Sequence, residues 1–497
     1  MESILMQLNL TSSYGGLNLI DPLDNMGAEY AIQMDNIIPE ANADVVRGGC
    51  KKLLNSACSM LIPSPISTKE RLITYNNGVL NAYSPLDFTT VKATKNDFTK
   101  ASWKYTQFTD GAGQAYTVIA NGVDTPQLFA NDAFADVGYD LDGISSLDCP
   151  LSFKNRLYFV GGDWTIYYSE VQSTSGALTP FEVGSYFKKG GRILTIENWT
   201  QDAGQGLDDL FVIFSTEGEV MVYKGTSPEA DDWQTLGVFQ IPRPVGKWCC
   251  ENVGADIIVI TEQGYLPLSS VLSDIRANRT SISAKINPIV QGKDFKNIKW
   301  EIHFYSTAGW VFINAPSNVP KYAHEQHVLN IHTNAWCRFV GWDAQTFCVL
   351  NDKLYFGNSA GVFEANNGTT DDGEYIVYKV QKAYNQFGTP LKKQLMRVVP
   401  RYSSFSNDEL FKCINSDFKE GRNRIIVRRS DFGYQSYWDT AIWDTNYWSD
   451  EYTVYSTRAG VQSRTGSFIS VGFYGRAKNS IEFYSTGLIL KAGTGHI

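Results

Sequence analysis

Clustered histidines are the first pattern in this 497-residue sequence that could do chemistry. Four of the five histidines lie at positions 303, 324, 327 and 332, and the run His324-Glu325-Gln326-His327 presents two imidazoles three residues apart. The zincin motif instead needs histidines four residues apart on a helix, with a glutamate directly after the first. Here the run follows Pro316 and Pro320 and precedes the strand-like residues 328–331. We therefore expect surface-loop histidines, no metal site and no cofactor.

Aromatic residues beside carboxylates raise the possibility of a carbohydrate site. Asp231-Asp232-Trp233 lacks the surrounding Ser-x-Asp-x-Gly-x-Thr-Trp pattern of a sialidase Asp box. Trp438, Trp443 and Trp448 fall five residues apart, and an aspartate closely follows each one. Such a series could stack on sugar rings or pack against a neighbouring subunit. We favour packing or a subunit interface, and a carbohydrate-binding or glycoside-hydrolase-like protein is the alternative.

Motifs for nucleophilic catalysis and nucleotide binding are missing from the sequence. It has no Gly-x-Ser-x-Gly elbow, no compelling Cys/His pair, no Walker loop and no dinucleotide fingerprint after a strand. The eight cysteines show no CxxC pair, and several lie in apolar contexts such as Phe347-Cys348-Val349-Leu350, which favours buried, reduced thiols. We therefore predict that the protein is not an enzyme.

Basic residues gather near the C-terminus. Strand alternation places Arg424 and Arg428 on one face, with Arg429 beside them. From residue 376 onwards the chain has a net charge of +7, the preceding residues carry -16, and the whole chain carries -9. The acidic part should repel nucleic acid phosphates. We expect Arg424, Arg428 and Arg429 to contact a partner protein.

A recurring hairpin supplies the framework for these residues. Two apolar or aromatic runs flank a glycine turn at seven places, which centre on Gly78, Gly122, Gly162, Gly218, Gly264, Gly309 and Gly361. The spacing matches roughly the one-blade period of four-stranded propeller units. Glycine suits these turns because they hold a residue at positive φ. The sequence thus predicts an all-β fold with a β-propeller of six or seven blades over residues 67–375.

The segments on either side of the hairpin series show other patterns. Residues 1–66 are predicted to form an N-terminal arm that contributes to a platform, with a short amphipathic helix over residues 25–36. Residues 376–497 are predicted to form a C-terminal β platform, sandwich-like or barrel-like, that serves assembly. The N-terminus lacks a basic leader, and no run approaches the ~20 apolar residues of a membrane span.

Several short motifs resemble those of tail hub or nozzle proteins from short-tailed bacteriophages, the podovirus tail tube and packaged-DNA stabilisation type. At the N-terminal end these motifs occupy residues 15–22, 25–26, 29–31 and 34–39, followed by Val45-Val46-Arg47-Gly48-Gly49. At the C-terminal end they occupy residues 467–472, 480–483 and 488–490. One departure is Cys50-Lys51-Lys52, where the family pattern would place a proline near the glycines.

That resemblance implies a structural virion protein. The subunit would form a homohexamer, a six-fold ring below the portal and adaptor proteins, in a virion tail assembled in the bacterial host cytoplasm. The ring would retain packaged DNA, conduct it during ejection and anchor tail fibre, spike or needle proteins. Double-stranded DNA would pass without sequence-specific binding, and an acidic wall would lower friction by repulsion.

Overall fold

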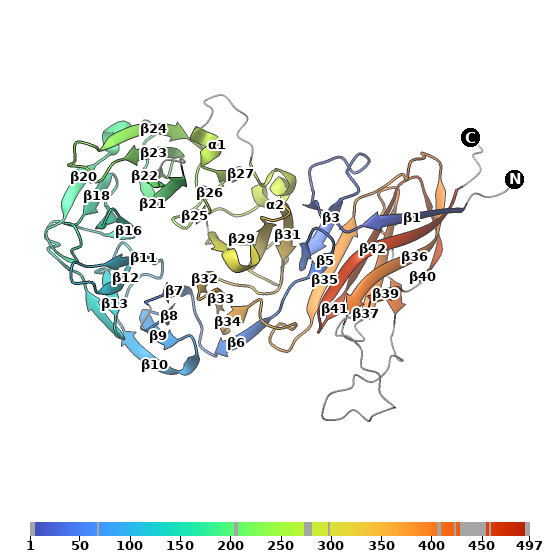
Figure 1. The fold of residues 1–497 in the computed structure, drawn as a ribbon, viewed down its shortest axis with the longest axis horizontal. Coiled ribbons are helices and arrows are strands. Elements are labelled where there is room, and N and C mark those ends of the chain that lie inside the picture. The colour runs from blue at the N-terminus through green and yellow to red at the C-terminus, as the bar shows by residue number, and fades with distance from the viewer. Residues whose placement is uncertain are drawn as a thin grey trace. The chain divides into compact units, whose positions relative to one another are not determined.

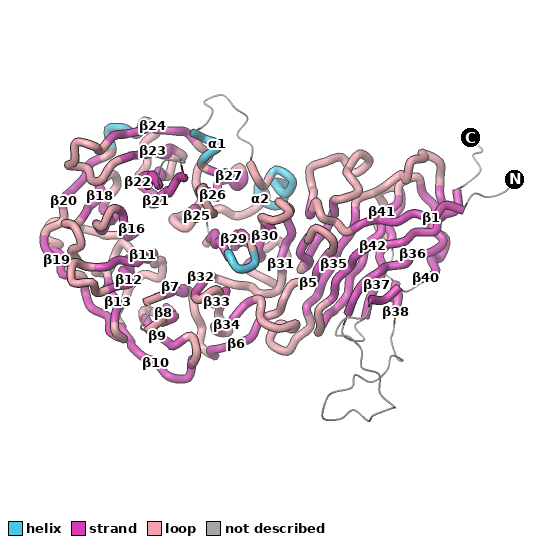
Figure 2. The backbone as a smooth tube through the Cα atoms, in the orientation of Figure 1, coloured by secondary structure: helices cyan, strands magenta, loops and turns pink. Residues whose placement is uncertain are grey.

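The computed structural model is built almost entirely of strands (Figures 1 and 2). It describes residues 5–66, 69–202, 207–272, 281–296, 299–404, 409–421, 424–427, 454–456 and 459–492. Two compact units are present. The first comprises Met1–Lys51, Gln326–Trp342 and Ala365–Ile497, and the second comprises Lys52–Glu325 and Asp343–Glu364. These bounds differ from the predicted ranges 1–66, 67–375 and 376–497, because residues inside the hairpin series pair with strands of the first unit.

The second unit consists of consecutive antiparallel sheets, each built from neighbouring segments of the chain. The first sheet contains β7 (Met60–Ser64), β8 (Arg71–Asn76), β9 (Val79–Ser84) and β10 (Asp87–Lys95), and the second contains β11 (Lys104–Thr109), β12 (Ala115–Ala120), β13 (Gln127–Ala130) and β14 (Ala133–Asp136). The third sheet contains β16 (Asp148–Phe153), β17 (Arg156–Gly161), β18 (Thr165–Tyr168) and β20 (Thr179–Glu182). The fourth contains β21 (Ile193–Asp202), β22 (Leu207–Ser215), β23 (Glu219–Lys224) and β24 (Gln234–Gln240). Two short strands, β15 (Gly138–Tyr139) and β19 (Ser175–Gly176), form a separate parallel pair. Along the chain, β15 precedes the third sheet and β19 lies between β18 and β20.

Three more groups of paired strands complete the series. They are β25 (Cys250–Val253), β26 (Asp256–Thr261) and β27 (Gly264–Pro267); β28 (Glu301–Tyr305) with β29 (Trp310–Pro316); and β32 (Thr346–Leu350), β33 (Lys353–Asn358), β34 (Gly361–Ala365) and β6 (Cys50–Leu54). Two short helices, α1 (Ser269–Leu272) and α2 (Asn287–Gln291), follow β27. Because β6 precedes β7 in the chain yet completes the last sheet, the beginning and end of the series are joined by backbone hydrogen bonds.

The sheets of the second unit follow one another around a common centre (Figure 1). Their first strands contact one another in order, with β11 against β16, β16 against β21, β25 against β28, β28 against β32 and β32 against β7. Apolar side chains fill the space between successive sheets, and one such cluster joins β16–β18 to β21–β23 around Tyr158 and Phe211. The predicted all-β propeller fold is confirmed, and within the described part of the chain seven groups of paired strands follow one another in the second unit.

All seven predicted glycine turns have the expected backbone geometry. Each of these glycines has a positive φ, from 66° at Gly309 to 152° at Gly361. L-amino acids with a side chain rarely adopt such angles. The periodic signal in the sequence therefore reflects a real conformational requirement at the tips of the propeller hairpins.

The first unit contains two sheets that pack face to face. One has the order β39 (Val454–Ser456), β36 (Lys393–Ser404), β42 (Ile481–Ala492), β5 (Asp44–Val46) and β4 (Ile37–Pro39), while β1 (Leu5–Thr11) also pairs with β42 and β40 (Ala459–Gly466) with β36. The other contains β31 (Ala335–Phe339), β3 (Tyr30–Asp35), β35 (Ile376–Lys382), β41 (Ile469–Ala477), β37 (Glu409–Ser416) and β38 (Arg424–Val427), while β2 (Gly16–Leu17) pairs with β3 and β30 (His324–Asn330) with β31. Phe473 and Phe483 stack between the sheets with ring centroids 5.4 Å apart.

Two sequence predictions are wrong in this part of the chain. Residues 25–36 contain no helix, and residues 30–35 form strand β3. Neighbours on both sides supply its hydrogen bonds, β35 and β31, and such tertiary pairing overrides a weak local periodicity. His324 and His327 do not lie in a surface loop, because strand β30 begins at His324 and buries both side chains.

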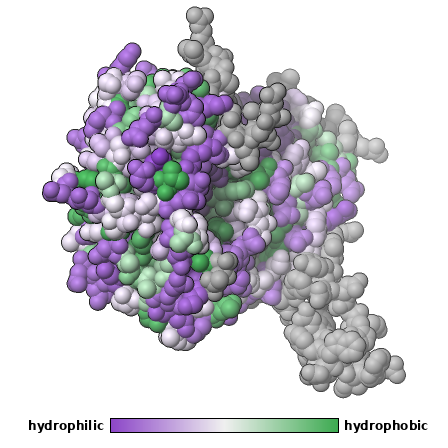
Figure 3. All heavy atoms as spheres, turned by 60° about the vertical axis from the view of Figure 1, so that its left-hand side comes forward, coloured by the Kyte–Doolittle hydropathy of each residue, from purple (hydrophilic) through white to green (hydrophobic). Residues whose placement is uncertain are grey.

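The face of the molecule seen in Figure 3 is mainly hydrophilic, and its hydrophobic residues appear singly or in small groups. Large apolar side chains that are exposed in the second unit include Leu86, Val123 and Val171, which belong to different sheets or loops. Among the described residues, no helix is both long and apolar enough to cross a membrane.

Two glycine turns provide a matched test of the propeller hairpins. Gly218 and Gly162 have φ values of 78° and 80°, so alanine at either position costs about 1 kcal/mol of backbone strain. An added Cβ at Gly218 would also lie 2.3 Å from the Ile241 carbonyl oxygen, whereas at Gly162 it would meet nothing within 4 Å. Gly218→Ala should therefore lower the thermal unfolding midpoint more than Gly162→Ala, as measured by circular dichroism. Equal shifts would contradict the proposed close packing at Gly218.

Candidate functional site

Charged side chains gather on the inner strands of the second unit, a set that we call the axial cluster. Its members come from different sheets and are Lys104 on β11, Glu197 on β21, Glu251 on β25, Lys299, and Glu301 and His303 on β28. Lys104 and Glu197 lie on sheets that are not neighbours in the series, yet their Nζ and Oε1 atoms are 2.7 Å apart. Such a contact is possible because the first strands converge towards the centre of a propeller.

Lys104 and Glu197 form a largely buried ion pair within the axial cluster. The Lys104 ammonium group lies 4.6 Å from the centre of the Trp248 ring and pairs with Glu197. Burial by itself lowers the pKa of this lysine, but the negative field of Glu197 outweighs burial and the net pKa is raised. Lys104 is thus a permanent cation that ties two sheets together.

Both oxygens of the Glu301 carboxylate are occupied. One accepts a hydrogen bond from Thr346 at 3.2 Å, and the other accepts one from the Phe347 backbone amide at 3.1 Å. Lys299 forms an ion pair with the same carboxylate, and His303 lies 3.4 Å from it. Burial raises the pKa of Glu301, yet the Lys299 charge and the His303 contact lower it overall to about 2. This carboxylate is therefore ionised and saturated with partners.

Glu251 shows the opposite behaviour. Burial raises the pKa of its carboxyl group to about 7, because the attraction of His303 offsets only part of the cost of desolvation. Carboxyl groups with opposite pKa shifts also occur as acid and base pairs in hydrolases. Here, however, Glu301 has no free oxygen for a base or nucleophile. The axial cluster is suited to holding inner strands together, and its geometry offers no catalytic pair among the described residues.

Thiol and metal chemistry find no support in the described residues. All eight cysteines are buried and free, in agreement with the prediction of reduced thiols. Burial raises the pKa of Cys58 and of Cys149 to about 12, so these thiols stay protonated and weakly nucleophilic. Among the described residues no group of three or more histidine, cysteine, aspartate or glutamate side chains could hold a metal ion. His324 lies 3.7 Å from Asp343, and burial lowers the pKa of its ring.

The predicted partner-contact residues lie mostly outside the described part of the chain. Arg428, Arg429, Trp438, Trp443 and Trp448 all fall outside the described residues. Only the backbone of Arg424 is described, and it opens strand β38 opposite Lys412 of β37. The role assigned to these residues stays a prediction.

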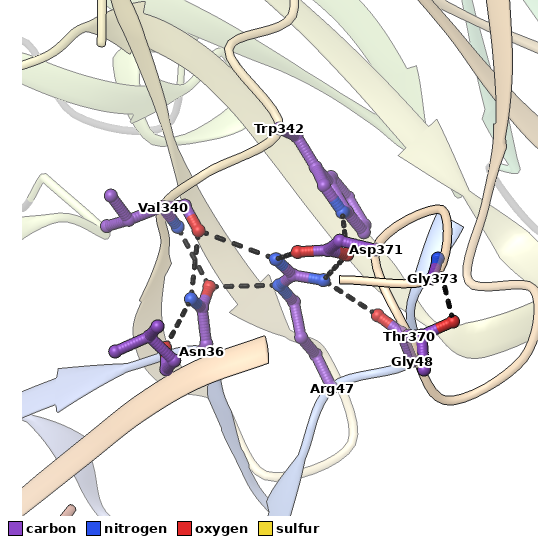
Figure 4. Close-up of polar contacts among 9 residues, drawn as sticks. Asn36, Arg47, Gly48, Val340, Trp342, Thr370, Asp371 and Gly373 are labelled. Carbon is purple, nitrogen blue, oxygen red and sulfur yellow. Dashed lines mark hydrogen bonds and ion pairs between the residues drawn. The ribbon is translucent and has the colours of Figure 1, made fainter. Parts of the chain in front are cut away.

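A second buried cluster, which we call the Arg47 hub, lies in the first unit (Figure 4). Arg47 donates hydrogen bonds to both oxygens of Asp371, at 2.9 and 2.8 Å, and its Nε donates to the Asn36 side-chain oxygen at 2.9 Å. Its guanidinium carbon lies 4.5 Å from the centre of the Trp342 ring, and the Trp342 indole nitrogen donates to Asp371 at 3.1 Å. The hub therefore joins three segments that are distant in sequence.

Asn36 and Gly49 also have the backbone geometry that the Arg47 hub requires. Asn36 has a φ of 56°, and its amide group donates to the carbonyl oxygens of Val340 and Val377. A Cβ on Gly49 would lie 1.9 Å from the Thr370 carbonyl oxygen, so only glycine fits there. The motifs at residues 34–39 and Val45-Val46-Arg47-Gly48-Gly49 marked Asn36 and Arg47 in the sequence, whereas nothing nominated Trp342 or Asp371 as their partners.

Comparison with known proteins shows a distant structural likeness only. No protein-family model and no curated protein matches the sequence. Among solved structures, the chain is similar to Raptor from Chaetomium thermophilum, with a TM-score of 0.41 and 9% identity over 65% of this chain and 28% of that one. It is similar to BBS1N from a complex with ARL6DN, with a TM-score of 0.42 and 9% identity over 66% and 99% of the two chains. BamB from Moraxella catarrhalis gives a TM-score of 0.38 and 13% identity over 64% and 98%.

Substitution at the Arg47 hub should show how strongly it stabilises the first unit. Arg47→Met removes a cation that is only 1% exposed from a carboxylate that is 20% exposed, and the loss of its hydrogen bonds to charged Asp371 should cost about 1.5–3 kcal/mol. Arg71→Met is the control, because Arg71 also bonds both oxygens of Asp132 but at a more exposed position. Chemical unfolding followed by fluorescence should give the larger loss for Arg47→Met. Equal losses would contradict the hub's structural role.

The opposite pKa shifts of the axial carboxyl groups predict opposite pH profiles. Glu251 has a folded pKa of about 7, above its ordinary value of 4.5, so its contribution to stability is full below that ordinary value and is lost as the pH rises through about 7. Glu251→Gln should therefore gain thermal stability relative to the natural chain on going from about pH 5 to about pH 8. Glu301, with a folded pKa of about 2, contributes above pH 4.5, and this contribution is lost as the pH falls towards 2.

Glu301→Gln should accordingly be destabilised near neutral pH, and the deficit should shrink in acid. Thermal midpoints measured across the pH range for the natural chain and both variants test this pair of outcomes. If both variants changed with pH in the same direction, the assigned environments would be wrong.

Proposed function

We propose that this chain is a structural subunit of the tail of a short-tailed bacteriophage, the hub or nozzle that forms a six-fold ring. In this role it retains packaged DNA, conducts it during ejection and anchors fibres, spikes or a needle. It adjoins the portal and adaptor proteins and resides in the virion tail. The proposal includes no enzymatic activity.

The observation that carries the proposal is the place of the resembling motifs in the fold. The N-terminal motifs include β3 and β5, and the C-terminal motifs include parts of β41 and β42. Strand β5 pairs with β42, while β3 and β41 both pair with β35. Motifs from the two ends of the chain thus belong to one compact unit. A shared structural requirement of that unit explains why both ends resemble the same family.

The glycines of the N-terminal motif support the same proposal. An added Cβ on Gly48 would lie 2.3 Å from the Asn366 side-chain oxygen, and one on Gly49 would lie still closer to Thr370. Gly49 requires glycine on steric grounds because its neighbour is backbone, whereas a side chain at Gly48 would have to displace the Asn366 amide; both lie next to the buried arginine of the hub. The motif therefore follows from the packing of this fold. This favours a fold shared with the tail hub or nozzle family over a chance resemblance in sequence.

Charge also fits passage of DNA without binding. The residues before 376 carry a net charge of -16, whereas the remainder carries +7. A protein that neutralised several phosphates would hold DNA tightly, and an acidic surface instead repels it. The basic remainder is suited to contact with an acidic neighbouring protein.

Imaging of the purified chain by electron microscopy tests the proposal most directly. We expect six-fold rings with a central hole, alone or on a portal and adaptor complex. The triple variant Arg424→Glu, Arg428→Glu and Arg429→Glu should abolish rings while its thermal midpoint stays unchanged. A control triple variant at the exposed lysines Lys92, Lys188 and Lys189 should assemble normally. Compact monomers under every condition, or normal rings from the arginine variant, would contradict the assignment.

A further inference from the structure

We propose that the second unit binds a neutral saccharide in a pocket formed by three neighbouring sheets. The pocket has a volume of about 470 Å³ and lies where the end of β7, the β11–β12 hairpin and the β16–β17 hairpin meet. Sites for small ligands typically occupy ~300–1,000 Å³. The space is thus adequate for a sugar unit.

The pocket is lined by polar and apolar residues, and none of them carries a charge at neutral pH. Tyr116 is the one titratable side chain among them. Charged groups nearby already have protein partners: Lys154 pairs with Asp209 at 2.8 Å, and Asp110 accepts the backbone amides of Ala112 and Gln114 and also hydrogen-bonds the Tyr116 side chain. A site without a cation offers little to a phosphate or a carboxylate. The lining therefore favours a neutral ligand rich in hydroxyl groups.

Four side chains in the pocket have unused hydrogen-bonding capacity. Within the described part of the chain, the side chains of Thr109, Ser152, Asn155 and Gln172 make no hydrogen bond to protein; Ser152 is half-buried, and the other three residues are exposed to solvent. Gln107, by contrast, is engaged, since its amide group bonds Pro63 at 3.3 Å and Thr117 at 3.0 Å. Each free carboxamide offers both donors and an acceptor, which suits adjacent hydroxyl groups of a sugar ring.

Hydrogen bonds to the backbone order the segments that carry the two carboxamides. The Gln172 amide donates to the Asn155 carbonyl oxygen at 2.7 Å, and the Gln172 carbonyl oxygen accepts the Gly111 amide at 2.9 Å. The Tyr139 hydroxyl group then fixes the following residue, Ser173, by donating to its carbonyl oxygen at 2.6 Å. Ordering of this wall before binding lowers the entropic cost of association.

Aromatic residues complete the pocket. Tyr116 is partly buried and packs against the apolar cluster that contains Phe108. A partly exposed ring beside free amides and hydroxyls gives the combination of apolar face and directional bonds that sugar rings can use. This pocket is separate in sequence from Trp438, Trp443 and Trp448, and its ligand chemistry holds whether or not the chain assembles into a ring.

Saturation-transfer NMR on the full chain tests the inference, with a panel of neutral probes: glucose, galactose, mannose, rhamnose and N-acetylglucosamine, with their common disaccharides. Glucuronate and glucose 6-phosphate serve as charged comparators. The double variant Thr109→Val and Ser152→Ala removes two free hydroxyl groups, whereas Thr235→Val changes an exposed threonine of β24 outside the pocket. Circular dichroism establishes that the variants are folded.

We expect saturable binding of at least one neutral sugar. The double variant should weaken it by about 5- to 100-fold, as expected for the loss of two hydrogen bonds, while Thr235→Val leaves it unchanged. Binding to no neutral probe, binding that survives the double variant, or preference for a charged comparator would each overturn the inference. A folded Asn155→Asp variant supplies a second test, because a carboxylate in place of the amide should reduce binding without removing the pocket.

Discussion

The buried guanidinium group of Arg47 is the interaction on which the first unit depends. It satisfies a carboxylate, an amide oxygen and a backbone carbonyl oxygen at once, and it stacks on Trp342. Lysine could not replace it, because the planar fork of arginine matches Asp371 with two parallel bonds. A buried ion pair of this kind specifies one arrangement of chain segments. Here the segments contain Asn36, Trp342 and Asp371, which no local signal brings together.

The chain reaches the propeller directly from this hub. Gly49 and Cys50 bond the backbone of residues 368 and 370, and β6 then completes the sheet of β32–β34. The strand that leaves the hub and the strand that returns to it therefore run next to each other. Closure of the sheet series and formation of the hub use neighbouring residues of one segment. Glycine is required at Gly49 because the backbone of Thr370 lies directly against it.

Inside the second unit, charge is used for cohesion. Lys104 and Glu301 are buried with their partners, and the cysteines around them are protonated. Polar groups with unused bonding capacity occur instead in the pocket at β11, β12 and β16. The centre of the propeller and the pocket thus have different physical characters. In the centre, Lys104 and Glu301 are paired internally, whereas the pocket presents donors and acceptors without a protein partner, which is the condition for recognising a ligand.

The periodic glycines allowed the propeller to be predicted, because each tight turn needs a positive φ that leaves a mark at a single residue. Alternation of apolar residues likewise identified strands at both ends of the chain. Sequence reasoning failed where the partners were distant: residues 30–35 became a strand between β31 and β35, and His324 and His327 became buried members of β30. By itself, the sequence determined the hairpins and their repeat. Only the tertiary structure decided the Arg47 hub, the axial cluster and the pocket, because their contacts join residues up to hundreds of positions apart, and burial and charge pairing depend on neighbours that local patterns do not encode.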